Sequence, residues 1–111
     1  DSNELQKEYA YKGQPYFLSE YGGLKYPDDN SGWGYNKEKI NSEEDFISRL
    51  LLIQKTIYNN PKISAACYTQ LYDVQHERNG LYYYDRKPKF SIDNIKRING
   101  IISAKSKYEE L

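Results

Sequence analysis

The chain lacks the charge excess and the long apolar runs that would point to two common classes of partner. Its 111 residues contain 16 basic and 16 acidic side chains, which gives a net charge of zero. Proteins that bind a phosphate backbone usually carry a basic excess, so nucleic acid is not expected as a partner. No apolar run approaches the roughly 18 residues that a membrane-spanning helix needs, so no membrane partner is expected either.

Cysteine and methionine are also scarce. Cys67 is the only cysteine, and its apolar neighbours predict a small buried core residue rather than a reactive thiol. One cysteine cannot form an internal disulfide, which favours a reducing, intracellular setting, although the localisation of a longer parent chain stays open. The sequence has no methionine and begins at Asp1, so we expect residues 1–111 to be a segment of a longer protein.

Tyrosine is the residue that the chain has in excess. There are 13 Tyr, one Trp and three Phe, and the tyrosines cluster near segments rich in turn-forming residues. A tyrosine ring offers an apolar face together with a hydroxyl group, a combination that suits amphipathic ligands such as sugars. The aromatic composition therefore favours a carbohydrate ligand.

The hydrophobic pattern predicts two strands, each followed by a long loop. Residues 15–20 and 63–70 are short apolar runs of the kind that form buried strands. Residues 24–41 and 71–90 are rich in turn formers and aromatics and are predicted to be loops, with a short extended piece at 81–84. Loops of this length in a compact domain are usually functional.

Each loop leads into a predicted helix. The first helix begins after a Ser42 N-cap, carries acidic residues in its first turn and ends at Asn59-Asn60-Pro61. Its apolar stripe has helical spacing and consists of Phe46, Ile47, Leu50, Leu51, Ile53 and Ile57. The second helix begins after Ser91 and continues through Gly100. Its apolar face is predicted to consist of Ile92, Ile95, Ile98 and Ile102. Residues 1–14 and 106–110 are predicted to fray.

This order predicts an α/β fold whose loops lie at the carboxyl ends of parallel strands, where such folds place their active sites. Two strands cannot close a barrel, and both keep an exposed edge. We therefore expect the fold to be incomplete. The open edges and the apolar helix faces predict that the isolated segment self-associates.

Glu20 is the first candidate for chemistry, because it ends an apolar strand and is separated from Gly22-Gly23 by one residue. A strand end holds a carboxylate rigidly, and glycines let a ligand approach the backbone. The alternative is a surface glutamate that merely ends a strand.

Three segments resemble glycoside hydrolase family 2, which includes β-galactosidases, β-glucuronidases and β-mannosidases. They are residues 15–23 (PYFLSEYGG), 66–73 (ACYTQLYD) and 79–88 (NGLYYYDRKP). The first is similar to the S-E-Y/F-G motif of strand seven, which carries the nucleophile, and the others resemble strand eight and its loop. The resemblance spans about residues 12–102. It implies that the chain is a partial (β/α)8 TIM barrel, its last two βα units, and that Glu20 is the catalytic nucleophile.

The resemblance also implies what the segment lacks. Retaining glycosidases use two carboxyl groups about 5 Å apart, and the family's acid/base is a Glu that follows Asn at the end of strand four. The only Asn-Glu pair here, Asn3-Glu4, stands at the wrong place. We therefore expect the isolated polypeptide to hydrolyse nothing.

Three further residues are candidates for substrate binding. Trp33 lies between two glycines on the loop after Glu20, so its ring either stacks on a sugar or plugs the loop against the barrel rim. Tyr68 and Gln70 end the second strand, where the family's equivalents line the sugar pocket. For Tyr68, core packing is the alternative.

No metal or cofactor is expected. His76 has no neighbouring histidine or cysteine with ligand spacing, and the chain contains no nucleotide-binding or CxxC motif. Four charged residues of the second loop are predicted to form ion pairs that stabilise it, namely Asp73, Arg78, Asp85 and Arg86.

Two other functional classes remain open beside a β-glycosidase that acts on a carbohydrate substrate. One is a carbohydrate-binding module without chemistry, and the other is a protein-interaction domain that uses the aromatic loops. Sugar-binding modules are mostly all-β sandwiches, so the two predicted helices speak against the first.

Overall fold

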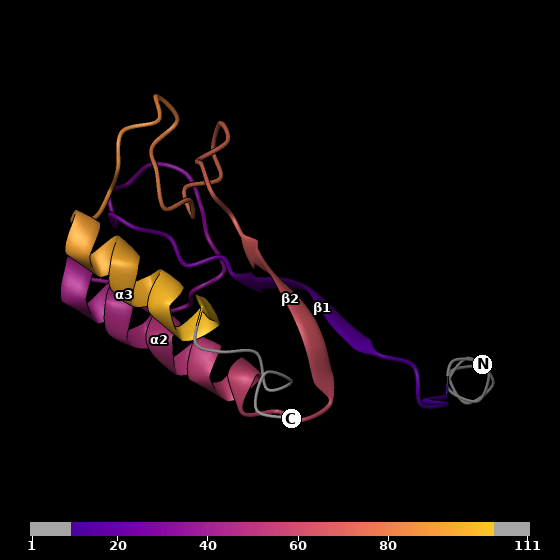
Figure 1. Ribbon diagram of the computed structural model, residues 1–111. Helices are drawn as coiled ribbons and strands as arrows, with labels where there is room; N and C mark the ends of the chain where they lie inside the picture. Colours follow the sequence, from indigo (N-terminus) through magenta and orange to yellow (C-terminus); the bar gives the residue numbers. More distant parts are fainter. Residues whose placement is uncertain (1–9, 104–111) are drawn as a thin grey trace, which may run out of the picture.

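The computed structural model describes residues 10–103, which form a small α/β unit (Figure 1). Strand β1 (Tyr16–Gly22) is followed by helix α2 (Glu43–Tyr58), strand β2 (Ile63–Thr69) and helix α3 (Ile92–Ser103). The predicted order of strand, loop, helix, strand, loop and helix is confirmed. Most of residues 1–14, where fraying is predicted, lies outside the described residues. Residues 106–110, which are also predicted to fray, lie wholly outside them.

The two strands are parallel, as the alternating order predicts, and their pairing is irregular near Glu20. Leu18 pairs with Ala66 and Tyr21 pairs with Tyr68, so β1 has one residue more than β2 over this stretch. An extra residue of this kind is a β-bulge, which increases local twist and re-aims side chains. Glu20 therefore lies within a bulge close to the carboxyl end of β1.

Helix α2 forms as its sequence signals predict. The Ser42 hydroxyl accepts a hydrogen bond from the Asp45 backbone N–H at 3.0 Å, and Asn59 is the C-cap. Phe46, Ile47 and Leu50 are fully buried. Helix α2 contacts both strands and packs along α3.

The start of α2 is joined to the start of α3 by polar contacts. The Glu43 carboxylate accepts hydrogen bonds from Ser91 N at 2.8 Å and from Asn94 Nδ2 at 2.7 Å. These bonds, that from Asn94 above all, hold the pKa of the Glu43 carboxyl below its usual value because they favour the charged form. Within α3, Ile95 and Ile98 are buried as predicted, whereas Ile92 is 66% exposed.

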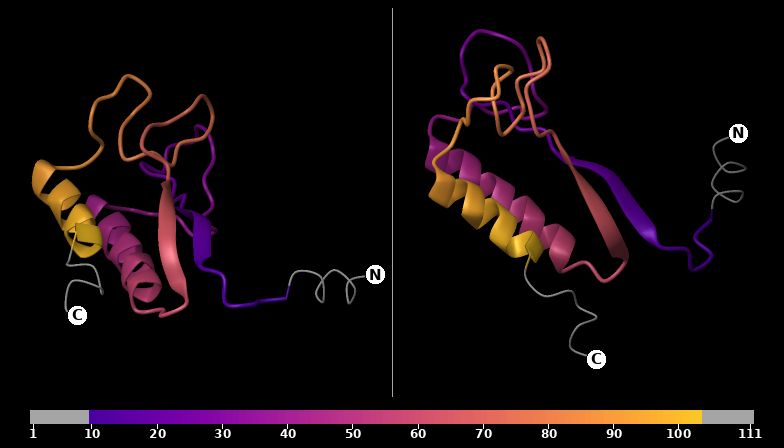
Figure 2. Two further views of the ribbon diagram at one scale, coloured as in Figure 1. Left: turned by 45° about the vertical axis from the view of Figure 1, so that its right-hand side comes forward. Right: turned by 45° about the horizontal axis from the view of Figure 1, so that its top comes forward.

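The hydrophobic core lies between the helices and the loops that follow the strands (Figure 2). Phe90 stacks on Phe46 with ring centroids 4.5 Å apart and on Tyr26 at 5.4 Å. The buried apolar residues are Leu24, Ile40, Phe46, Ile47, Leu50, Leu81, Phe90, Ile95 and Ile98. Both long loops thus contribute to the core, which fixes them relative to the strand ends.

The strands themselves are far less buried than their apolar sequences predict. Phe17 is 62% exposed, and Ala65, Ala66 and Cys67 are exposed as well. The prediction that Cys67 is a buried core residue is therefore wrong for this chain. Ala65, Ala66 and Cys67 are consecutive, so both sides of the strand are exposed here. The reason is that, within residues 10–103, α3 does not contact the strands and α2 contacts each of them only slightly.

We expect the isolated chain to self-associate through this uncovered strand pair. Phe17→Lys should shift the sedimentation profile towards the monomer, because a charge on this apolar surface opposes its burial. The matched control is Leu52→Lys, which replaces an apolar residue that is 67% exposed on α2. If the unmodified chain sediments as a monodisperse monomer, the expectation is refuted. If both variants shift the profile equally, the strands are not the surface through which the chains associate.

Candidate functional site

Glu20 lies near the carboxyl end of β1, within the bulge and next to Tyr21, which packs against the core. The Glu20 side chain is exposed and forms no hydrogen bond or ion pair with residues 10–103. Its carboxylate is therefore open to solvent in the described part of the chain.

The loop after β1 is fixed to the end of β2 by backbone hydrogen bonds. Gly23 N donates to Thr69 O at 2.6 Å, and Tyr35 N donates to Gly23 O at 2.7 Å. Gly22 and Gly23 have positive φ values of 94° and 66°, which side-chain-bearing residues rarely adopt. A Cβ on Gly22 would strike the Tyr68 ring, and one on Gly23 would strike the Tyr35 ring. The glycine pair is therefore required both for the turn and for the close approach of two aromatic rings.

Trp33 is held by its backbone and leaves much of its ring free. Its N–H donates to His76 O at 2.7 Å, and its carbonyl accepts from Arg78 N at 2.9 Å. These bonds join the loop after β1 to the loop after β2. The Trp33 side chain is 46% exposed and meets the Tyr35 ring edge to face, with centroids 5.4 Å apart. The backbone thus pins the loops together while the ring stays accessible to a ligand.

Tyr68 is placed with the core, which is the alternative role that the sequence left open. Its ring meets Tyr21 edge to face at 5.4 Å, and the pair packs against the core cluster. The Tyr68 hydroxyl is buried without a hydrogen-bond partner among residues 10–103, and this burial raises its pKa. Tyr68 packs against the core, whereas the Glu20 side chain is exposed and forms no hydrogen bond with Tyr68.

Gln70 lies just beyond β2, at a non-proline cis peptide bond with Thr69. Its carbonyl accepts a hydrogen bond from Leu81 N at 3.2 Å, which ties the strand end to the second loop. Its side-chain Nε2 is buried and has no partner in the described part of the chain. Gln70 is thus positioned at the strand end with one donor unsatisfied.

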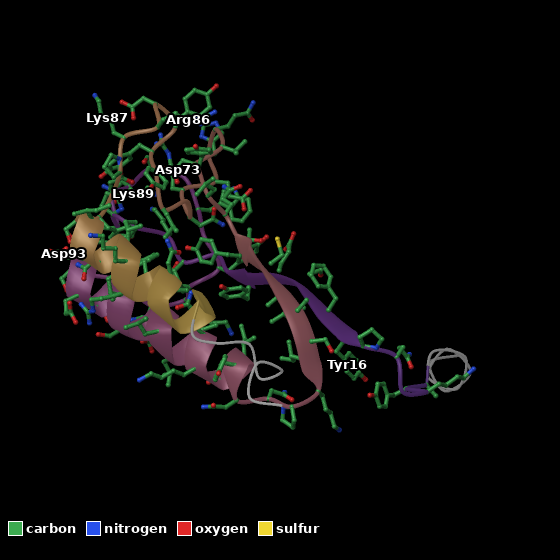
Figure 3. The ribbon with its side chains drawn as sticks, viewed as in Figure 1. Tyr16, Asp73, Arg86, Lys87, Lys89 and Asp93 are labelled. Carbon is green, nitrogen blue, oxygen red and sulfur yellow. The ribbon has the colours of Figure 1, made fainter. Side chains whose placement is uncertain are left out.

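A buried ion pair organises the loops around these residues (Figure 3). Lys89 Nζ donates to Asp73 Oδ1 at 2.7 Å, to Tyr26 O at 2.6 Å and to Arg78 O at 3.1 Å. Asp73 Oδ1 also accepts from Gly80 N at 2.9 Å. The Lys89 and Asp73 side chains are only 0% and 1% exposed. Burial lowers the pKa of Lys89, and the contact with Asp73 partly offsets this effect.

The predicted ion pairs of the second loop form only in part. Arg78 lies 3.8 Å from the Asp73 carboxylate, as predicted. Asp85 pairs instead with Lys87 at 3.1 Å. Arg86 forms no such pair, because its guanidinium donates to Tyr84 O and lies 4.1 Å above the Tyr72 ring. The short extended piece predicted at 81–84 is reduced to isolated bridges of Tyr82 with Tyr72 and Pro88.

Two residues of this region were missed by the sequence analysis. The sequence did not distinguish Lys89 from the exposed lysines of the loops. The only signal of its burial was its position directly before the buried Phe90. Tyr35 belongs to Gly32-Trp33-Gly34-Tyr35, where the alternation of glycine and aromatic residues was a signal that it shares the role of Trp33.

Among residues 10–103, no group of three or more His, Cys, Asp and Glu side chains is arranged to hold a metal ion. No helix in that range combines the length and apolarity needed to cross a membrane.

Comparison with known proteins gives no relative from which a role could be transferred. The sequence matches no family model and no curated protein. The function of the chain is therefore inferred from its residues and their geometry.

Proposed function

We propose that this chain is a segment of a retaining β-glycosidase, similar to the β-galactosidases, in which Glu20 is the nucleophile. The observation that carries the proposal is the position of Glu20. It stands exposed in a β-bulge near the carboxyl end of a parallel strand, separated by one residue from a glycine pair. The resemblance of residues 15–23 to the nucleophile motif of glycoside hydrolase family 2 supports the same role.

The proposed fold is the end of a (β/α)8 barrel, with β1 and β2 as neighbouring strands. The exposed apolar residues Phe17, Ala65 and Cys67 support this proposal, because a complete barrel would bury that side of the strands. The missing strands would also cover the open strand edges. The same strands would bring the acid/base carboxyl group that the resemblance places outside this segment.

The chemistry follows from the position of the two carboxyl groups. The ionised Glu20 carboxylate attacks the anomeric carbon while the acid protonates the departing glycosidic oxygen, so a C–O ester bond forms as the glycosidic bond breaks. The acid, now a base, then takes a proton from water, which attacks the same carbon and releases Glu20. Two inversions at one carbon retain its configuration.

Trp33 and Gln70 are proposed as substrate-binding residues, and Tyr68 as a supporting residue in this arrangement. The exposed Trp33 ring offers a face for stacking on a sugar. The unsatisfied Gln70 Nε2 offers a donor for a hydroxyl oxygen. Tyr68 packs behind Gly22 and so fixes the turn that follows Glu20.

The direct test is to trap the ester in the full-length protein. A 2-deoxy-2-fluoro glycoside with a dinitrophenolate leaving group forms the glycosyl-enzyme but releases it slowly, because fluorine destabilises the cation-like transition state. We expect the mass of the 2-fluoro sugar on the peptide that contains Glu20. A label on another carboxylate would overturn the assignment, and a turnover that inverts the anomeric centre would overturn the mechanism.

The alternative is a carbohydrate-binding unit without catalysis, and the exposed pair of Trp33 and Tyr35 favours it independently of Glu20. The trapping experiment separates the two classes. A binding unit would hold the fluorosugar reversibly and gain no covalent mass.

A further inference from the structure

Trp33 and Tyr35 form an aromatic corner at the point where the two long loops meet. Their rings are inclined by 72° with centroids 5.4 Å apart, and both side chains are largely exposed, at 46% and 59%. Leaving an aromatic ring exposed to water is unfavourable, and a mobile loop would not hold two such rings in a fixed arrangement. An ordered, exposed aromatic pair is the kind of surface that binds the apolar face of a ligand.

The backbone under this corner is unusually constrained. Gly32 has a φ of 62°, and a Cβ there would strike His76 O and the Arg78 side chain, so the two loops are in direct contact at that point. Trp33 is bonded on both sides to the second loop, and Tyr35 is bonded to Gly23. Gly34 packs against Lys25, with no room for a side chain. Backbone bonds thus position Trp33 against the second loop and Tyr35 against Gly23, and this preorganisation is what tight recognition needs.

The geometry points to a subsite for the leaving-group sugar. We propose that Trp33 and Tyr35 together bind a pyranose ring on the leaving-group side of Glu20, with Trp33 stacked on the ring and Tyr35 bounding its edge. This inference rests on the proposed glycosidase function. In the proposed barrel, the reacting sugar would occupy the interior next to Glu20. The aromatic corner instead belongs to the loops beyond the strand ends, at the rim of the proposed barrel. The sugar that it binds is therefore the leaving-group sugar.

The sugar-binding part can be tested on the 111-residue chain itself, because Trp33 is its only tryptophan. Titration with methyl β-D-glucopyranoside and with cellobiose should produce a saturable change in tryptophan emission. Sorbitol has similar hydroxyl groups but no ring face, and it should produce none. Tyr35→Ala should weaken binding several-fold. The matched control Tyr84→Ala removes a tyrosine that is 63% exposed on the other loop and should leave binding unchanged.

The leaving-group assignment needs the full-length protein. Trp33→Ala should lower kcat/KM for a β-linked disaccharide about tenfold more than for the matching glycosyl fluoride, because fluoride is too small to reach the corner. An equal loss for both substrates would overturn the assignment, since Trp33 would then serve the reacting sugar or the fold. No saturable emission change, or the same change with sorbitol, would overturn sugar binding at the corner.

The two proposals fail in different ways. If Glu20 is trapped but Trp33 emission does not respond to sugars, only the subsite is wrong. If sugars bind at Trp33 but no ester forms on Glu20, the glycosidase function fails, and with it the leaving-group assignment, while the aromatic corner stands as a sugar-binding site.

Discussion

Glu20→Ala in the full-length protein is expected to lower kcat by about 10⁴-fold or more, since no other group can form the glycosyl ester. The loss should appear in kcat for an aryl β-glycoside, while KM changes little. Glu38→Gln is the matched control, because it alters a carboxylate whose side chain is 85% exposed and paired only with Arg49. That control should retain normal turnover. Normal activity of Glu20→Ala would refute the nucleophile assignment.

A chemical rescue sharpens this result. Glu20→Ala leaves space where the carboxylate stood, and azide can enter it and attack the anomeric carbon of an activated dinitrophenyl β-glycoside. The expected product is the α-glycosyl azide, with dinitrophenolate released, because one displacement inverts the centre. A β-glycosyl azide, or rescue of Glu38→Gln as well, would show that azide acts at another position. Absence of any azide product would contradict the nucleophile role of Glu20.

Lys89→Met should cause a large loss of stability in this chain. The change leaves the Asp73 carboxylate buried without its ammonium partner, and it also removes one hydrogen bond from the carbonyl group of Tyr26 and one from that of Arg78. Removing one partner of a buried pair costs about 3–5 kcal/mol, a large part of the 5–15 kcal/mol that stabilises a typical domain. We expect a large fall in the midpoint of urea unfolding, monitored by circular dichroism.

Lys87→Met is the matched control for this prediction. Lys87 lies on the same loop and pairs with Asp85, but its side chain is 79% exposed. Figure 3 places it at the outer end of the loop, whereas Lys89 lies close to Asp73 near the helices. Exposed pairs contribute about 0–1 kcal/mol, so the midpoint should barely move. Equal midpoints for the two variants would contradict the structural role given to Lys89.

A second variant keeps the test informative if Lys89→Met does not fold. Asp73→Asn preserves the shape of the side chain and its acceptor for Gly80 N but removes the charge. Combined with Lys89→Met, it should recover part of the lost stability, because no unpaired charge is then buried. A double variant less stable than Lys89→Met alone would show that the pair does not act as a unit.

Much of the local structure was predictable from short-range signals. Ser42 and the acidic residues after it begin α2, Asn59 ends it, and Ser91 precedes α3. These signals act within one helical turn, so they can be read directly from the sequence. The parallel pairing of β1 and β2 also followed, because a helix between two strands favours a parallel crossover.

Burial was predicted less well, because it depends on which layers surround an element. Cys67 and its alanine neighbours have the sequence of a buried strand but are exposed, since the described helices make little contact with the strands. Tyr68 was expected at a sugar pocket or in the core, and the fold places it in the core with Tyr21. The strand pattern sets which residues share a face but not what covers that face.

The sequence by itself determined the elements, the loops at the carboxyl ends of the strands, and the carboxylate that stands before the glycine pair. Only the tertiary structure decided that Lys89 is buried against Asp73 and that Trp33 and Tyr35 meet in one corner. The physical reason is range. Caps and periodicity act between near neighbours in the chain, whereas these contacts join segments that come together only when both loops fold onto the same core.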